Sequence, residues 1–144
     1  MLLMLAVFCA VLVADKLAKA AIVARLQEGT FTSGIIGGVR FRHVVNRRNP
    51  WGSIRAIRIL MVLWLGLVAA ALIAASLVGI PSVHVALGAL IGGATGNLLD
   101  GISKNGVTDF VDLRVWPVFN LADAAIVGGA MLLLWTAIRF PAAS

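Results

Sequence analysis

The stretch that decides the fold is I-L-M-V-L-W-L-G-L-V-A-A-A-L-I-A-A-S-L-V-G-I, which runs from Ile59 to Ile80. It contains no charged residue, and it is long enough to cross a hydrocarbon core, which needs about 20 apolar residues in a helix. Gly79 and Pro81 mark its end, as is typical of a helix terminus. The stretch is therefore predicted to be a membrane-spanning helix.

The composition of the whole chain agrees with this prediction. The chain has 144 residues, of which 61% are hydrophobic and 12% are charged, whereas soluble domains carry roughly 25% charged residues. Apolar stretches at residues 2–26, 83–99 and 118–138 are the other predicted spans. We expect an all-α membrane protein with four transmembrane helices, folded as a single domain over residues 1–144, with both chain ends on one side.

The segment between the first two spans is polar and differs in character from the spans. Its V-R-F-R-H-V-V run at residues 39–45 is rich in β-branched residues, which favours a strand. We expect a small extramembrane β-cradle between the first and second helices. The residues between the third and fourth spans, which include Gly101, Asn105, Gly106 and Pro117, are expected to form a loop.

Charge and cysteine usage exclude several classes of function. The net charge is +6, and the basic residues cluster mainly between Arg25 and Arg58, beside apolar spans. Membrane lipids with anionic headgroups are therefore expected partners, and nucleic acid is not. The single cysteine, Cys9, provides no disulfide framework. His43 and His84 have no partners at metal-ligand spacing, so no metal site is expected.

Two features of the spans predict how the helices meet. Asp15 and Lys19 are four residues apart in the first span, so they lie on one helical face and can pair. The third span contains glycines at positions 88, 92 and 96, a stripe of small residues that allows two helices to approach closely. Close packing there would hold Asn97 and Asp100 at the membrane edge.

Two further aspartates stand beside spans, Asp109 in V-T-D-F and Asp123 in F-N-L-A-D. A carboxylate in a membrane helix costs roughly 2.5 to 3.5 kcal/mol on insertion scales, so it is a candidate functional group. If both lie in one pocket, they share a proton, and one can act as a base while the other acts as an acid. Their spacing leaves an alternative open, in which one caps a helix and the other pairs with Arg114 or Lys104.

Four motifs carry a resemblance to a known family. They are D-K-L-A-K at 15–19, G-G-A-T-G-N-L-L-D at 92–100, G-V-T-D-F-V-D-L at 106–113 and W-P-V-F-N-L-A-D at 116–123. In this order they resemble the lipoprotein signal peptidases, also called signal peptidase II, which are aspartic peptidases of the bacterial cytoplasmic membrane. The resemblance implies an aspartic endopeptidase that removes signal peptides from diacylglyceryl-modified prolipoproteins on the amino side of the lipidated cysteine.

The resemblance also implies roles for individual residues. It places the catalytic dyad at Asp109 and Asp123. Asp112, three residues after Asp109, is expected to be polar loop surface outside the reaction. The residues that match supporting or substrate-binding positions of the family are Asp15, Lys19, Asn46, Asn97, Asp100 and Asn120.

The implied setting is the bacterial inner membrane, with both termini cytoplasmic and the active site toward the outer face. A lipidated prolipoprotein is the implied substrate, no metal or organic cofactor is implied, and a monomer is expected. One pattern opposes this orientation, because most basic residues would then lie outside, whereas the positive-inside rule places them in the cytoplasm.

The chain departs from the family pattern at two places. Gly101 stands where the family usually has an arginine, which removes a donor fork. The segment N-R-R-N-P-W-G-S at 46–53 replaces a family segment of the form N-x-G-A-A-F-S. Arg47 and Arg48 are candidates to supply the missing charge, and Trp51 to replace the aromatic residue. These departures favour a second hypothesis, a catalytically silent relative that binds lipoprotein precursors or another membrane partner without cleaving them. A third is a small transporter with Asp15 and Lys19 as a proton relay.

Overall fold

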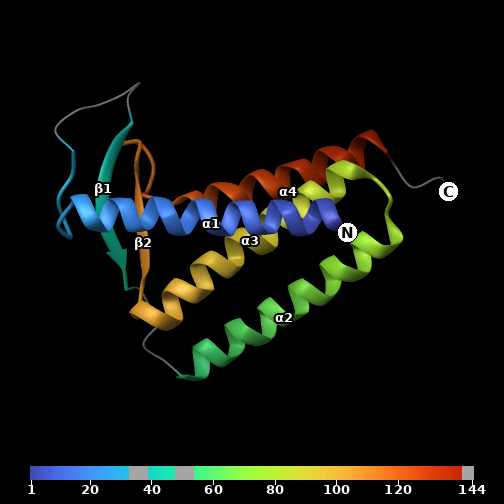
Figure 1. The fold of residues 1–144 in the computed structure, drawn as a ribbon, viewed down its shortest axis with the longest axis horizontal. Helices are drawn as coiled ribbons and strands as arrows, with labels where there is room; N and C mark the ends of the chain where they lie inside the picture. Colours follow the sequence, from blue (N-terminus) through green and yellow to red (C-terminus); the bar gives the residue numbers. More distant parts are fainter. Residues whose placement is uncertain (33–38, 48–53, 141–144) are drawn as a thin grey trace.

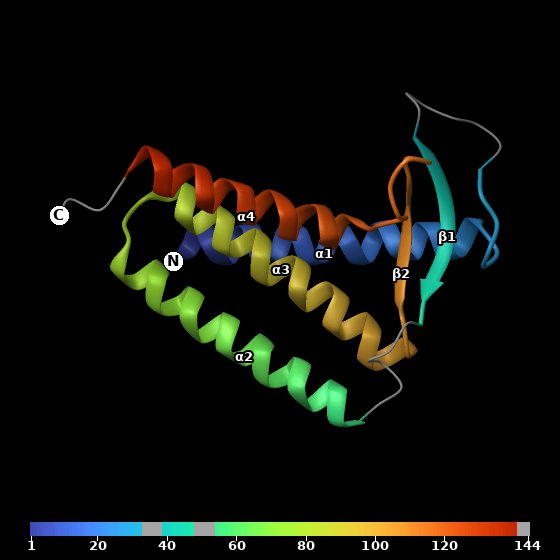
Figure 2. The ribbon, with the colours of Figure 1, turned by 180° about the vertical axis from the view of Figure 1, so that it is seen from behind.

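The computed structural model describes residues 1–32, 39–47 and 54–140. Within them lie four helices and two strands. In chain order these are α1 (Leu2–Arg25), β1 (Arg40–Asn46), α2 (Ile54–Leu77), α3 (Pro81–Lys104), β2 (Val107–Asp112) and α4 (Leu121–Arg139). Figures 1 and 2 show α1, α3 and α4 side by side, with α2 inclined away from α1 and α4. The two strands cross the end of the molecule that lies opposite the N-terminus and the last turn of α4.

Three of the four helices, α2, α3 and α4, are long and apolar enough to cross a membrane. The remaining helix, α1, has 24 residues, about 36 Å at the rise of an α-helix, but it carries Asp15, Lys16 and Lys19 within its length. The structure therefore supports a mostly helical protein with three apolar spans. The fourth span stays a prediction.

Two helices extend beyond the predicted spans. The second span was expected to start at Ile59, whereas α2 starts at Ile54 and includes Arg55 and Arg58 in its first turns. The third was expected to be short, at 83–99, whereas α3 continues to Lys104 and has 24 residues. In the last turn of α3, Lys104 pairs with Asp100 at 3.2 Å.

The β-cradle is present, but its position in the chain was only half predicted. Strand β1 lies between α1 and α2 as expected. Its antiparallel partner β2 comes from the segment between α3 and α4 that was predicted to be a loop. Arg40 faces Asp112, Val44 faces Asp109 and Asn46 faces Val107, with an irregularity between Phe41 and Val44. Five of the six β2 residues are buried, so no alternation of polar and apolar residues marks this strand in the sequence.

Helix α3 is the centre of the bundle because its glycines admit neighbours on two faces. A Cβ atom at Gly88 would lie 2.5 Å from the Met4 carbonyl oxygen of α1, and one at Gly92 would lie 2.9 Å from the Phe8 carbonyl oxygen. On the other face, a Cβ at Gly93 would lie 2.4 Å from the Ala122 carbonyl oxygen of α4. The prediction of close packing along this stripe is confirmed.

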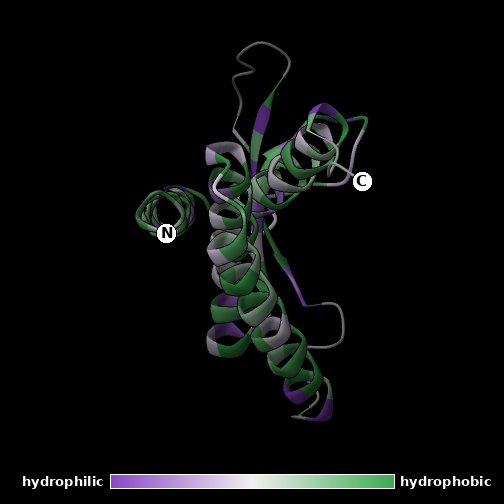
Figure 3. Cartoon of the chain, turned by 90° about the vertical axis from the view of Figure 1, so that its right-hand side faces the viewer, coloured by the Kyte–Doolittle hydropathy of each residue, from purple (hydrophilic) through white to green (hydrophobic). Residues whose placement is uncertain are grey.

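The outer faces of the helices are apolar. Figure 3 shows the helices largely in the green of hydrophobic residues, with purple segments on the strands and near helix ends. Large apolar side chains such as Leu2, Val62 and Ile138 are 82%, 67% and 71% exposed. Contiguous exposed apolar surface of this kind suits contact with lipid.

Candidate active site

A backbone return brings the two aspartate motifs together. Asp109 lies in β2, and after Asp112 the chain turns back so that Phe119 pairs with Val111. The Val111 N–H donates to the Phe119 carbonyl at 2.7 Å, and the Phe119 N–H donates to the Val111 carbonyl at 3.1 Å. Because this pairing is antiparallel, it places Asn120 beside Asp109, and α4 begins at the next residue.

Asn120 joins the start of α4 to both aspartates. It is the N-cap residue, and its side-chain oxygen accepts from the Asp123 N–H at 2.9 Å while the Asp123 carboxylate accepts from the Asn120 N–H at 3.1 Å. This reciprocal pair is a capping box. The Asn120 amide nitrogen donates to Asp109 Oδ1 at 2.7 Å. One fully buried asparagine thus contacts Asp109 and Asp123 together.

The alternative to a shared site is therefore half correct. Asp123 does take part in capping α4, as that interpretation proposed. Asp109, however, has amide partners, Asn120 and Asn46, with the Asn46 contact at 3.5 Å. The cations proposed for it are placed elsewhere, since Lys104 pairs with Asp100 and the Arg114 backbone N–H donates to Asp112.

Asp109 occupies an environment that favours its protonated form. Its residue is 5% exposed, and burial raises its pKa from 3.8 to about 6. The hydrogen bond from Asn120 opposes this rise in pKa, while the charge of Asp123 adds to it. Repulsion between the two carboxylates is what a proton-sharing pair requires.

Asn97 holds Asp123 from α3. Its side-chain oxygen accepts from Lys19 Nζ at 3.0 Å and from the Asn120 amide at 3.1 Å. An ammonium group can only donate, so Asn97 must turn its oxygen toward Lys19. Its amide nitrogen is then directed at Asp123 Oδ1, 2.7 Å away. Lys19 therefore orients the amide that contacts Asp123.

Beneath the aspartates lies a buried ionic cluster of Asp15, Lys19 and Asp100. Lys19 Nζ is 2.7 Å from Asp15 Oδ2 and 3.0 Å from Asp100 Oδ2, and all three side chains are at most 1% exposed. The predicted Asp15–Lys19 pair is confirmed. Asp15 Oδ1 also accepts from the Ala122 N–H in the first turn of α4 at 3.0 Å. Buried charges need such complete pairing, because each one loses its hydration.

The expectation for Asp112 was wrong. It is 3% exposed and ends β2, where its Oδ2 accepts from Arg40 Nε at 2.9 Å and pairs with Arg40 Nη2 at 2.5 Å. The hydrogen bond from Arg40 lowers the pKa of Asp112. Its partner lies 72 residues away in the chain, which is why the sequence suggested a free polar loop residue. Asp112 thus links the end of β2 to Arg40 of β1.

Two grooves reach the polar centre. An open groove of about 600 Å³ is lined by Arg42, Asn46, Asp109, Pro117 and Val118, among others. A smaller apolar groove of about 240 Å³ lies between α2 and α3 and ends at Asn97. At its side, Trp64 Nε1 donates to Thr95 Oγ1 at 3.0 Å and ties the two helices together. The open groove thus reaches Asp109 beside β1, and the apolar groove between α2 and α3 reaches Asn97.

The ion pairs that Lys16 and Arg40 form with Asp100 and Asp112 were not predicted from the sequence. Lys16 Nζ is 2.6 Å from Asp100 Oδ1; its position inside D-K-L-A-K was the available signal. Arg47, a candidate to supply the charge absent at Gly101, pairs with Glu28, and Gly101 is buried in α3. Arg48 and Trp51 lie outside the described residues. Within the described part of the chain, no group of three or more His, Cys, Asp or Glu side chains could hold a metal ion.

Comparison with known proteins adds a family. Residues 7–139 match the family described as signal peptidase (SPase) II. The lipoprotein signal peptidase of Pelotomaculum thermopropionicum is 34% identical over 140 residues, which cover 92% of this chain and 90% of the relative. That of Syntrophomonas wolfei is 37% identical over 134 residues, with coverages of 88% and 87%.

Solved structures share the fold. One, described as a bacterial membrane enzyme structure obtained by the in meso method at 2.3 Å resolution, has a TM-score of 0.82 and 20% identity, and the match covers 96% of this chain and 89% of that one. A second, with the same description at 1.9 Å resolution, has a TM-score of 0.80 and 20% identity, with coverages of 98% and 94%. The arrangement of four helices and a two-stranded sheet is therefore that of these membrane enzymes.

Proposed function

The chain belongs to the signal peptidase II family, and from this premise we propose that it is an aspartic endopeptidase that removes signal peptides from diacylglyceryl-modified prolipoproteins. Asp109 and Asp123 form its catalytic pair. The observation that carries the proposal is the single buried amide of Asn120, which contacts both residues through its side chain. A silent binding protein would not need two carboxylates held around one asparagine.

The surroundings of the two aspartates support different roles for them. Each Asp123 oxygen accepts a hydrogen bond, from the Asn97 amide and from the Asn120 backbone, and it lies in the positive first turn of α4. These contacts stabilise a carboxylate, so Asp123 is proposed as the base. Burial raises the pKa of Asp109 to about 6, so Asp109 is proposed as the acid.

The proposed reaction is hydrolysis through one water molecule. The water oxygen bonds to the scissile carbonyl carbon while Asp123 accepts a proton from the water. As the carbon–nitrogen bond breaks, Asp109 transfers its proton to the leaving nitrogen, and the pair then exchanges the proton to restore the starting state. The hydrogen bonds that Asn120 and Asn97 donate keep the two carboxylates in position during both transfers.

The grooves support a route for a lipidated substrate. The peptide is proposed to lie along the open groove beside β1, next to Asn46 and Asp109. The lipid chains are proposed to enter from the bilayer through the apolar groove between α2 and α3. All four helices then span the inner membrane, with both termini cytoplasmic and the β1–β2 sheet at the outer face. Membrane burial of α1 is plausible because Asp15 and Lys19 neutralise each other.

The test is cleavage of a lipidated prolipoprotein by the purified protein in detergent. We expect Asp109→Asn and Asp123→Asn each to lower the cleavage rate at least about 100-fold, the usual scale of acid–base catalysis. The control is Glu28→Gln, which alters an exposed carboxylate outside both β2 and the pair and should retain cleavage. Cleavage by either dyad variant would contradict the assignment of residues, whereas an inactive parent would favour the silent relative.

A further inference from the structure

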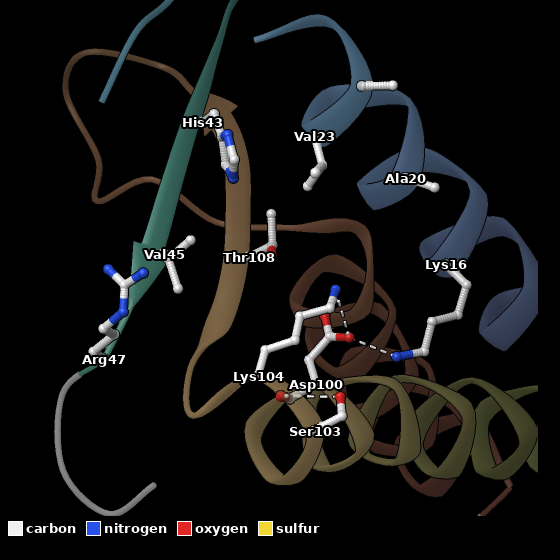
Figure 4. A pocket seen from close by; sticks show the side chains of 11 residues that line it. Lys16, Ala20, Val23, His43, Val45, Arg47, Asp100, Ser103, Lys104 and Thr108 are labelled. Atoms are coloured by element: carbon white, nitrogen blue, oxygen red, sulfur yellow. Dashed lines mark hydrogen bonds and ion pairs between the residues drawn. The ribbon is translucent and has the colours of Figure 1, made fainter. Parts of the chain in front are cut away.

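A further cavity lies beside the β1–β2 sheet, and neither Asp109 nor Asp123 lines it. It has a volume of about 620 Å³, is open to the surface, and is lined by residues of α1, β1, β2 and the end of α3. Figure 4 shows Lys16 and Lys104 converging on Asp100 at its base, with Ala20 and Val23 on the α1 side and His43 and Thr108 on the strand side. Among the residues that the structure describes, only Val45 and Arg47 line both this cavity and the open groove at Asp109.

The base of this cavity carries excess positive charge. Asp100 Oδ1 is 2.6 Å from Lys16 Nζ and 3.2 Å from Lys104 Nζ, and its other oxygen contacts Lys19. Lys19 is also paired with Asp15. Three ammonium groups therefore face two carboxylates, and one positive charge is uncompensated within the cluster.

The other charged residues near the cavity do not remove this excess. Arg47 is paired with Glu28, so that pair is neutral as a whole. The side chains of Lys16 and Lys104 are 37% and 45% exposed, whereas Asp100 is fully buried. The cations therefore keep hydrogen-bond donors open to an incoming anion, while the carboxylate is shielded from it.

The walls of the cavity suit a lipid better than a soluble anion. Ala20, Val23 and Ala24 of α1 form one apolar side, and Val45 of β1 contributes to the other. A membrane placement of the apolar helices α2, α3 and α4 puts their ends, and with them Lys104 of α3, in the headgroup layer. Basic residues at that depth attract anionic lipids by about 1 kcal/mol each.

We propose that the cavity between α1, α3 and the β1–β2 sheet binds the phosphodiester of an anionic phospholipid, and that Lys16 and Lys104 donate hydrogen bonds to it. A phosphodiester carries a single negative charge, which equals the excess of the cluster. The glycerol and upper acyl carbons would contact Ala20 and Val23. This site is independent of the peptidase assignment, because its residues are not those of the dyad.

The experiment uses the full chain in nanodiscs of equal parts phosphatidylglycerol and phosphatidylcholine, and native mass spectrometry counts the lipids retained on release. We expect preferential retention of phosphatidylglycerol, and a roughly fivefold weaker retention in Lys16→Gln and in Lys104→Gln, the loss that corresponds to one interfacial cation. The matched control is Arg139→Gln, which removes the same charge at the other end of the bundle and should retain phosphatidylglycerol fully.

A second variant separates binding from folding. Ala20→Phe fills the cavity but leaves every ion pair of the cluster in place, so it should lose phosphatidylglycerol, whereas Val13→Phe, on an exposed part of α1 away from the cavity, should not. Equal retention of the two lipids, or unchanged retention in Ala20→Phe and Lys16→Gln, would overturn the proposal. If millimolar inorganic phosphate in lipid-free detergent raises the Tm of the parent but not of Lys16→Gln, the site belongs to soluble phosphate and the lipid assignment is wrong.

Discussion

Asp109 is the residue whose ionisation most directly links the site to pH. Burial raises its pKa to about 6, and the proposed mechanism requires its protonated form. The value of kcat/KM should therefore fall as pH rises through about 6. A pH profile of cleavage by the parent enzyme measures this limb. A flat profile between pH 5 and pH 8 would show that Asp109 is not the acid.

The same residue predicts a dependence of folding stability on pH. A carboxyl group whose pKa is higher in the folded state than in the unfolded state binds its proton more tightly when folded. Its contribution to stability is complete below pH 3.8 and is lost as pH rises through about 6. Asp109→Asn avoids this loss, so its Tm should exceed that of the parent by a few degrees at pH 7.5 and match it near pH 3.5. Thermal unfolding in detergent at both pH values checks the prediction, and an equal difference in Tm at both would contradict it.

Asn97 should act on the reaction through Asp123. Its amide donates to Asp123 Oδ1 at 2.7 Å, and a hydrogen bond to a charged group is worth about 1.5 to 3 kcal/mol. Asn97→Ala should lower kcat by about 10-fold or more with a smaller change in KM, because it alters the base and leaves the open groove intact. Ser103→Ala is the control, since that hydroxyl bonds within α3 at 2.6 Å from the Leu99 carbonyl. An effect of Asn97→Ala confined to KM would place Asn97 in substrate binding.

At the scale of elements, α3 decides how closely the helices pack. Gly88 has no room for a Cβ, because that atom would lie 2.5 Å from the Met4 carbonyl oxygen, a backbone atom of α1. Gly88→Ala should therefore separate α1 from α3 and lower the Tm. Gly128 is also helical, but a Cβ there would contact nothing within 4 Å. Gly128→Ala should leave the Tm unchanged or raise it, since alanine is favoured over glycine in a helix by about 1 kcal/mol. Equal effects of the two variants would show that α1 and α3 are not in tight contact.

The β1–β2 sheet shows why strand β2 was not predicted from the sequence. The pattern V-R-F-R-H-V-V predicted β1 because its β-branched residues lie between turn residues. V-T-D-F-V-D contains two acids in six residues, which argues against a strand. It is a strand because its acids are satisfied by distant partners, Asp109 by amides and Asp112 by Arg40. Tertiary contacts outweighed local propensity there.

At the scale of the whole molecule, the N-terminus and the last turn of α4 lie at the end opposite the β1–β2 sheet (Figure 1). The proposed orientation puts Gln27, which follows α1, outside the cytoplasm and Arg139 inside. It also puts most basic residues outside, against the positive-inside rule. Single cysteines at these two positions, in a Cys9→Ala background, can be treated with a membrane-impermeant thiol reagent in intact cells. Labelling at position 27 but not at 139 is expected. The reverse pattern would place the site at the cytoplasmic face.

The sequence by itself determined the class of the protein and the identity of its main groups. Apolar runs, the glycine stripe and the Asp15–Lys19 spacing act over one or two helical turns, so their consequences are local and can be predicted without coordinates. Only the tertiary structure decided that β2 is a strand, that Asp112 is buried against Arg40, and that Asn120 contacts both aspartates. It also decided that Lys16 and Lys104 meet at Asp100 beneath a cavity. The contacts of Asp112 with Arg40, of Asn120 with Asp109 and of Lys16 with Asp100 join different elements of the fold. They depend on how helices and strands pack, which no local pattern encodes.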